Sequence, residues 1–102
     1  MQYKPGSRWK SAVCSTEVVI VRPPSAAGCL SCGGHVVVPY DAVSVASAKI
    51  DGLLAGGTML GKRYFDQSSG MEVLVTKAGD GTLSLDGRSL VLRTAKPLPS
   101  SD

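Results

Sequence analysis

The sequence has few charged and few aromatic residues. Charged side chains make up 19% of the 102 residues and aromatic side chains 5%, against 43% hydrophobic residues. An ordinary soluble domain is roughly one quarter charged, so this chain leaves much neutral surface and must build its core from Val, Leu, Ile and Ala. Neutral surface on a small domain favours burial against another chain, although a surface rich in Gly, Ser and Ala would have the same composition.

Neither sign of charge dominates the chain. It has 11 Lys and Arg residues against 8 Asp and Glu residues, a net charge of +3. Proteins that bind nucleic acid concentrate basic side chains on one face, whereas the local basic cluster here is limited to Lys4, Arg8 and Lys10 around Trp9. We therefore do not expect a nucleic-acid partner, and we interpret the cluster as a solvated N-terminal segment.

Long apolar runs are also missing. No run approaches the roughly 18 residues that span a bilayer, and residues 1–10 lack the apolar stretch of a secretory signal. We therefore expect no membrane partner and a soluble, cytoplasmic protein. In that compartment the three cysteines, an odd number, are expected to be free or metal-bound rather than paired in disulfides.

Two valine-rich runs predict buried strands. Residues 17–22 are dense in β-branched side chains and stop at Pro23–Pro24, and residues 35–38 stop at Pro39. Continuous apolar runs of this length are typical of strands covered on both faces. Proline cannot donate to a strand ladder, so each proline marks the end of a strand.

The last third of the chain has the clearest strand pattern. Apolar and polar residues alternate in four segments that are separated by glycine-containing turns or an Asp-Gly pair, namely 62–66, 71–77, 82–85 and 88–93. Asp86–Gly87 suits the positive φ angles of a two-residue hairpin turn. We therefore predict a four-strand antiparallel meander.

The other segments have weaker patterns. Residues 40–57 fit a helical stripe loosely, with Asp41 as a candidate N-cap, but Gly52 and Gly56–Gly57 limit any helix to a turn or two. Residues 1–13 and 94–102 are expected to be extended or partly ordered tails.

Together these patterns predict one small β domain over residues 1–102. The fold class is all-β, a small barrel or sandwich with a C-terminal four-strand antiparallel meander and at most one short helix.

A candidate metal site lies where the cysteines cluster. Cys29 and Cys32 have the C-x-x-C spacing of a metal knuckle, and Cys14 and His35 would complete four ligands for tetrahedral zinc. We predict a structural zinc held by these four residues. Two alternatives remain open. The C-x-x-C pair could be redox-active, although no helix follows it to acidify a thiol, or the cysteines could simply pack in the core.

No pattern in the sequence assigns a reaction. It has no Ser-His-Asp order, no G-x-S-x-G turn and no phosphate-binding loop. We therefore expect a non-catalytic accessory subunit or interaction domain, with a protein partner or a homo-oligomer as its assembly.

Two other functions stay open at this point. One is a small-molecule-binding β-barrel or minor enzyme that uses the loops 23–35 and 40–57 as the rim of its site. The other is a single-stranded nucleic-acid module that uses Tyr64 and Phe65 beside two basic residues.

The zinc prediction has a direct test. Protein purified without a metal-affinity tag should carry about one zinc per chain, and its three thiols should stay masked until denaturation. Metal analysis combined with a thiol titration measures both quantities. Metal-free protein with three titratable thiols would contradict the prediction.

Overall fold

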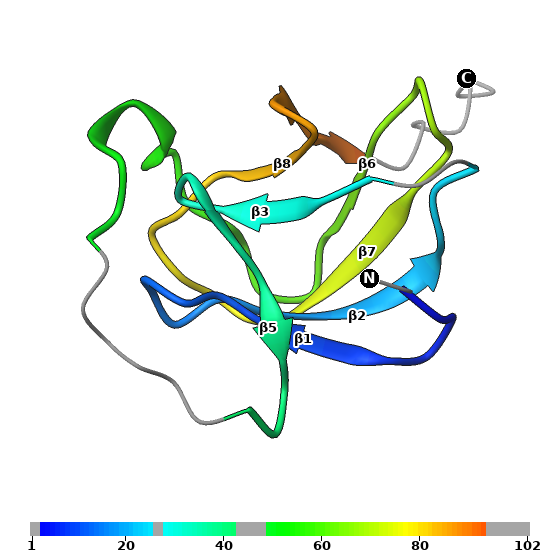
Figure 1. Ribbon diagram of the computed structural model, residues 1–102, viewed down its shortest axis with the longest axis horizontal. Helices are drawn as coiled ribbons and strands as arrows, with labels where there is room; N and C mark the ends of the chain where they lie inside the picture. The colour runs from blue at the N-terminus through cyan, green and yellow to red at the C-terminus, as the bar shows by residue number, and fades with distance from the viewer. Residues whose placement is uncertain (1–2, 26–27, 43–48, 94–102) are drawn as a thin grey trace, which may run out of the picture.

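The computed structural model describes residues 3–25, 28–42 and 49–93. Within these ranges nearly all regular structure is strand (Figure 1), and the predicted all-β fold is confirmed. The strands in chain order are β1 (Arg8–Lys10), β2 (Glu17–Arg22), β3 (Leu30–Cys32), β4 (His35–Val36), β5 (Val38–Pro39), β6 (Arg63–Phe65), β7 (Glu72–Lys77), β8 (Leu83–Leu85), β9 (Arg88–Ser89) and β10 (Val91–Arg93).

The helical content of the described ranges is one 3-10 turn, η1 (Gly52–Leu54). Asp51 caps it, because the Asp51 Oδ1 atom accepts a hydrogen bond from the Leu53 N–H at 3.0 Å. The N-cap expected at Asp41 precedes residues 43–48, which lie outside the described residues, as does the tail 94–102. No helix in the described part of the chain is long and apolar enough to cross a membrane.

The strands form two antiparallel sheets. Within the described residues the larger sheet has six strands in the order β10-β6-β7-β2-β1-β5, and the smaller has four in the order β4-β3-β8-β9. All neighbouring strands run antiparallel. In Figure 1, β3 and β8 lie on one side of the molecule and β1 and β2 on the other, so the sheets face each other as two layers.

Two chain segments belong to both sheets and close the layers into a flattened barrel. After β4, which pairs with β3, the chain passes through Val37 and continues as β5 beside β1. After β9, which pairs with β8, it passes through Leu90 and continues as β10 beside β6. Both crossing residues are buried, and their N–H groups donate to the Leu30 and Leu83 carbonyls at 3.0 and 2.9 Å. The described strands therefore pair around a complete circuit, which protects the sheet edges along it.

Both crossing strands follow a tight two-residue turn. Gly33 and Gly34 have φ angles of 63° and 89°, and Asp86 and Gly87 have φ angles of 50° and 82°. Two successive positive φ angles give the turn whose twist matches that of the flanking strands. The hairpin turn predicted at Asp86–Gly87 is confirmed, and Gly33–Gly34 is a second turn of the same kind.

The predicted four-strand meander is wrong at its centre. Strand β6 pairs with β7, and β8 pairs with β9, but β7 lies beside β2 and β8 lies beside β3. The connection between β7 and β8 leaves the larger sheet, where Gly79 bridges Thr58, and the Thr82 carbonyl then accepts from Gly33 N–H at 3.0 Å in the smaller sheet. This connection contains Gly79 and Gly81. It takes the chain to the smaller sheet, where Leu83 and Leu85 on β8 face inward and are buried between the two layers.

The N-terminal segment joins the larger sheet through β1, which pairs with both β2 and β5. The Trp9 ring is buried against Tyr3, with 4.8 Å between the ring centroids. The Tyr3 hydroxyl accepts a hydrogen bond from the Leu30 N–H at 2.9 Å. Two aromatic side chains therefore hold this segment to β3 of the opposite sheet. The sequence could not predict this contact, because a three-residue strand is too short to show a periodic pattern.

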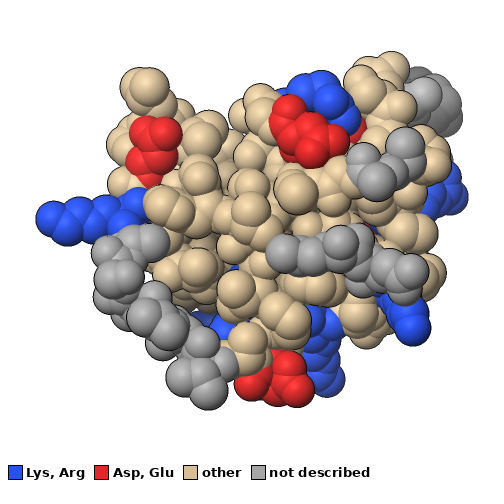
Figure 2. Space-filling model, viewed as in Figure 1, with Lys and Arg blue, Asp and Glu red and all other residues tan. Residues whose placement is uncertain are grey.

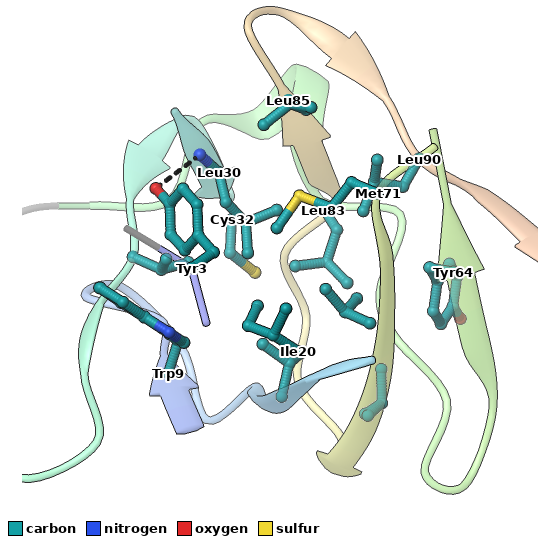
Figure 3. Packing of buried hydrophobic residues seen from close by; sticks show 14 residues of the cluster. Tyr3, Trp9, Ile20, Leu30, Cys32, Tyr64, Met71, Leu83, Leu85 and Leu90 are labelled. Atoms are coloured by element: carbon teal, nitrogen blue, oxygen red, sulfur yellow. Dashed lines mark hydrogen bonds between the residues drawn. The ribbon is translucent and has the colours of Figure 1, made fainter. Parts of the chain in front are cut away.

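Aliphatic side chains from both sheets fill the interior (Figure 3). Strand β2 contributes Val18 and Ile20, whereas Val21 is exposed. The prediction that this strand is covered on both faces is therefore wrong, because a barrel has one interior and its strands alternate between inside and outside. The buried apolar cluster consists of Tyr3, Trp9, Val18, Ile20, Leu30, Cys32, Val37, Tyr64, Met71, Val73, Val75, Leu83, Leu85 and Leu90.

A buried carboxylate joins the β6–β7 turn to β9. Asp66 is 5% exposed, and it accepts hydrogen bonds from Arg88 Nη2 at 2.9 Å and from Ser69 Oγ at 2.7 Å. The hydrogen bond from Arg88, with further help from Ser69, lowers the pKa of Asp66 to about 2 despite the opposing effect of burial. The charged form of this carboxylate is therefore the form that stabilises the fold.

Asp66→Asn should lower the free energy of unfolding by about 2 kcal/mol at about pH 6, because it removes charge-assisted hydrogen bonds. The folded pKa is depressed, so this stabilisation is complete above the unfolded value of about 3.9 and is lost as the pH falls through about 2. Urea unfolding at about pH 6 and at about pH 2 measures the free energy of unfolding of variant and wild type. The difference between the two proteins should be smaller at the lower pH. Asp80→Asn, at an exposed position, is the control, and an equal difference at both pH values would contradict the prediction.

Candidate functional site

Two of the three cysteines meet at one end of the barrel. Cys14 lies in the loop between β1 and β2, and Cys32 is the last residue of β3. Their Sγ atoms are 3.8 Å apart, although the residues are 18 positions apart in the chain. Both cysteines are unpaired thiols, Cys32 with no exposed surface and Cys14 half-buried. This pair, with the groups around it, is the candidate site, and we call it the dithiol site.

A compact loop directs Cys14 toward the barrel. Ser11 N–H donates to the Thr16 carbonyl at 2.9 Å and closes the base of the loop. The Ser11 Oγ atom accepts from the Val13 and Cys14 N–H groups, both at 3.1 Å. With the backbone held in this way, the Cys14 Sγ atom lies 3.3 Å from both Ser11 Oγ and Thr16 Oγ1.

Buried hydroxyl groups extend the site away from the sulfur atoms. Thr16 is 1% exposed, and its Oγ1 atom lies 2.9 Å from Thr58 Oγ1. Thr58 Oγ1 in turn accepts from the Gly79 N–H at 3.1 Å. In the part of the chain that the structure describes, no buried side-chain nitrogen or oxygen lacks a hydrogen-bond partner. The network is therefore fully satisfied and holds the hydroxyl groups in fixed positions beside the thiols.

The turn between β7 and β8 lies directly against both sulfur atoms. A Cβ atom at Gly79 would be 3.0 Å from Cys14 Sγ and 2.5 Å from Thr16 N, and one at Gly81 would be 2.8 Å from Cys32 Sγ. Such distances leave no room for a side chain at either position. Glycine is therefore needed here because the backbone itself covers the dithiol site.

The two thiols have opposite acid–base character. Burial raises the pKa of Cys14, but hydrogen bonds from the Ser11 and Thr16 hydroxyls outweigh it. Backbone N–H groups of Thr16 and Gly81 add to this effect, so the pKa of Cys14 is lowered to about 7. Burial, and then the proximity of Cys14, raises the pKa of Cys32 to about 12. One member of the pair is therefore a partly ionised nucleophile at neutral pH and the other a protonated thiol.

The structure does not gather the four predicted zinc ligands. Cys29 is exposed whereas Cys32 is buried, because residues three apart on an extended strand point to opposite faces. The His35 Nε2 atom lies 2.9 Å from the Lys49 carbonyl oxygen. Among residues 3–25, 28–42 and 49–93, no three His, Cys, Asp or Glu side chains form a group that could hold a metal ion. Cys14 and Cys32 are the part of the predicted set that the fold brings together, and the zinc itself stays a prediction.

The residues behind the two alternative functions are also placed. The loops 23–35 and 40–57 meet where Asp51 N–H donates to the Gly33 carbonyl at 2.9 Å, while residues 26–27 and 43–48 of these loops lie outside the described residues. Tyr64 is buried in the core and is not available to stack on a base. Phe65 is partly covered by Arg93, whose guanidinium carbon lies 5.8 Å from the ring centroid.

Sequence reasoning missed most of the dithiol site. It named both cysteines but not Ser11, Thr16 or Thr58, and it treated the Gly79–Gly81 segment as an ordinary turn. One signal was present, since Cys14 and Cys32 each lie three residues before a valine-rich run. Strands that enter the same barrel from the same end place the residues before them close together.

No protein-family model, no curated protein and no solved structure matches this chain.

The acidity of Cys14 can be tested in a Cys29→Ser background, which removes the exposed thiol. Thr16→Val keeps the shape of the side chain but removes one hydroxyl from the sulfur, so the pKa of Cys14 should rise. The rate of alkylation by iodoacetamide at about pH 7 should then fall about five-fold, because the thiolate is the reactive form. Thr76→Val, at an exposed threonine, is the matched control. Equal alkylation rates in the Cys29→Ser protein and in its Thr16→Val and Thr76→Val derivatives would contradict this account of the site.

Proposed function

We propose that this chain is a non-catalytic interaction module that binds another protein through the face that carries η1, β4 and β5. The observation that supports this most is Leu53, whose side chain is 93% exposed on η1. Single exposed apolar residues are common on proteins, so the argument depends on how Leu53 is held and on what surrounds it.

Leu53 projects from a braced turn. Asp51 caps η1 through its hydrogen bond with Leu53 N–H, and Asp51 N–H is fixed to the Gly33 carbonyl. Leu54, the next residue, packs against the Gly33–Gly34 turn, where its Cδ1 atom lies 3.6 Å from the position of a Cβ atom built on Gly34. An apolar side chain on a fixed backbone loses little conformational entropy when it enters a partner's pocket.

The centre of the face that carries η1, β4 and β5 is poor in charge, whereas η1 lies toward its outline beside the exposed Lys49 and Asp51. Figure 2 shows mainly uncharged residues across the centre of this face, with the charged side chains toward its outline. Val36 on β4 and Tyr40 after β5 are exposed large apolar residues of this region. Depletion of charge at the centre, with aromatic and aliphatic side chains exposed there, is typical of protein–protein interfaces. The low charge content of the whole sequence agrees with the same use.

Most ionisable side chains of the described chain have structural partners. Asp66 binds Arg88, and Glu72 lies between Arg63 and Arg93, with nitrogen–oxygen distances of 2.9, 3.5 and 3.0 Å. Other pairs follow the same pattern, namely Glu17 with Lys77, Asp86 with the Cys29 N–H, and His35 with the Lys49 carbonyl. Carboxylates held in this way bind groups of the chain itself and are not free to exchange protons with a substrate. This favours a binding role over acid–base catalysis.

The filled interior favours a surface role over ligand binding inside the barrel. The largest fully buried side chains include Ile20, Leu30, Met71 and Leu85, and they come from both sheets. Figure 3 shows them directed toward one another in the space between the sheets. A small molecule would have to displace them, at the cost of the packing that stabilises the domain.

Leu53→Asp should weaken association without affecting the fold, because Leu53, at 93% exposed, makes little contact with the rest of the domain. Light scattering on the purified chain detects a second copy as the partner, and co-purification from native extract detects a different protein. We expect the variant to lose at least ten-fold in affinity, as for the loss of one anchoring side chain. Thermal unfolding should be unchanged.

Leu60→Asp is the matched control, since Leu60 is also exposed, at 64%, but lies on the turn before β6. It should leave association intact. Wild-type protein that stays monomeric at high concentration, with any co-purifying protein retained equally by Leu53→Asp and Leu60→Asp, would rule out this face as the interface.

A further inference from the structure

We propose that Cys14 and Cys32 form a reversible intramolecular disulfide when the protein meets a hydroperoxide or a small-molecule disulfide. The dithiol site would then be a redox modification site that links the two sheets of the barrel. This inference is independent of the face around Leu53 and depends on the geometry of the two sulfur atoms.

The two sulfur atoms are already neighbours. Their separation of 3.8 Å is close to van der Waals contact, and a disulfide brings the sulfur atoms to about 2.05 Å. Cys32 is held in the strand ladder of β3, whereas Cys14 belongs to a loop whose base is closed by the Ser11–Thr16 hydrogen bond. A change in the Cys14 side-chain torsion with a small shift of its loop closes the gap, and the strands need not move.

The two cysteines differ in exposure in the way that a redox pair requires. Cys14 is partly exposed, whereas Cys32 has no exposed surface. The hydroxyls of Ser11 and Thr16 are placed 3.3 Å from the Cys14 sulfur, where they stabilise a thiolate. Cys14 is therefore the attacking thiol and Cys32 the resolving thiol.

The reaction with a hydroperoxide balances in two steps. The Cys14 thiolate attacks the terminal peroxide oxygen, the O–O bond breaks, and protonation of the leaving oxygen gives water or an alcohol and a sulfenic acid on Cys14. Cys32 Sγ then attacks the Cys14 sulfur, the S–O bond breaks, and the Cys32 thiol proton leaves with the hydroxyl as water. The two thiols lose two electrons to the peroxide, and a dithiol reductant reverses the step by two exchanges.

The Cys29–Cys32 pair, although it has the C-x-x-C spacing, is the wrong pair for this chemistry. Strand β3 alternates, so that Leu30 and Cys32 face the interior while Cys29 is exposed. A disulfide needs Cβ atoms about 3.8 Å apart, which side chains on opposite faces of a strand cannot reach. Two hydrogen bonds with Asp86 also fix the Cys29 backbone. The Cys29 N–H donates to Asp86 Oδ1 at 2.9 Å, and the Cys29 carbonyl accepts from Asp86 N–H at 3.1 Å.

The bridge would connect the two sheets covalently at this end of the barrel. Cys14 belongs to the β1–β2 connection of the larger sheet, and Cys32 ends β3 of the smaller sheet. A cross-link between residues 18 positions apart restricts the unfolded chain and raises the melting temperature, here by on the order of 10 °C. The Gly79–Gly81 turn, which already lies on both sulfur atoms, would cover the bridge.

The test uses the whole 102-residue chain with Cys29→Ser, treated with one equivalent of hydrogen peroxide. We expect the loss of two hydrogen atoms by mass spectrometry, the loss of both remaining thiols, and a melting temperature higher by on the order of 10 °C. Cleavage after Glu17 separates Cys14 from Cys32 in the sequence, so a disulfide-linked peptide pair identifies the bond. Dithiothreitol should reverse all of these changes.

The control adds Cys14→Ser to the same background and should keep its single thiol and its melting temperature. Circular dichroism confirms that the control is folded. If it is not, wild-type protein with all three cysteines replaces it, and peptide mapping shows which bond forms. A Cys29–Cys32 bond, a dimer linked through Cys29, or Cys14 oxidised to a sulfinic acid while Cys32 stays a free thiol would each overturn the proposal.

Discussion

The barrel depends on two places where a strand passes from one sheet to the other, at Val37 and Leu90. At each crossing the buried side chain points into the core, while its N–H group donates to a carbonyl of the preceding strand. Each crossing follows a two-residue turn with positive φ angles, Gly33–Gly34 in one case and Asp86–Gly87 in the other. The turn sets the pairing of the strand before the crossing residue, which is β4 or β9. Burial of the crossing residue then directs the strand after it, β5 or β10, to the opposite sheet. The six-stranded sheet is thereby bordered at both edges, by β5 and β10.

The same closure produces the dithiol site. Since β3 lies at the centre of the smaller sheet and β2 at the centre of the larger, the residues before and after them converge at one end of the barrel. The β7–β8 connection crosses between the layers at this end, and its glycines allow the backbone to rest against both sulfur atoms. Cys14 and Cys32 thus share one environment, but the buried Cys32 stays protonated while hydroxyl and N–H donors stabilise the Cys14 thiolate. A thiol pair of unequal character follows from burial, hydrogen bonding and the proximity of the two sulfur atoms.

The dithiol site and the proposed protein-binding face share the Gly33–Gly34 turn. Gly33 follows Cys32 directly, its N–H donates to the Thr82 carbonyl, and its own carbonyl accepts from Asp51 N–H, the residue that caps η1. The backbone of this turn therefore touches the connection that covers the sulfur atoms on one side and the turn that presents Leu53 on the other. Both proposals concern the end of the barrel where the loops gather, which is where a rigid sheet scaffold most often places function.

The sequence by itself determined the all-β class, the strand-rich last third, the hairpin turn at Asp86–Gly87 and the short helical turn, because these depend on residues close together in the chain. It did not determine strand order, and the expected meander was wrong at its centre because pairing of β7 or β8 with a distant strand depends on burial across the whole barrel. For the same reason the C-x-x-C spacing pointed to Cys29 with Cys32, whereas strand alternation separates these two residues. Only the tertiary structure decided that Cys14 lies beside Cys32, since the closure of the barrel brings together two segments that are 18 positions apart in the chain.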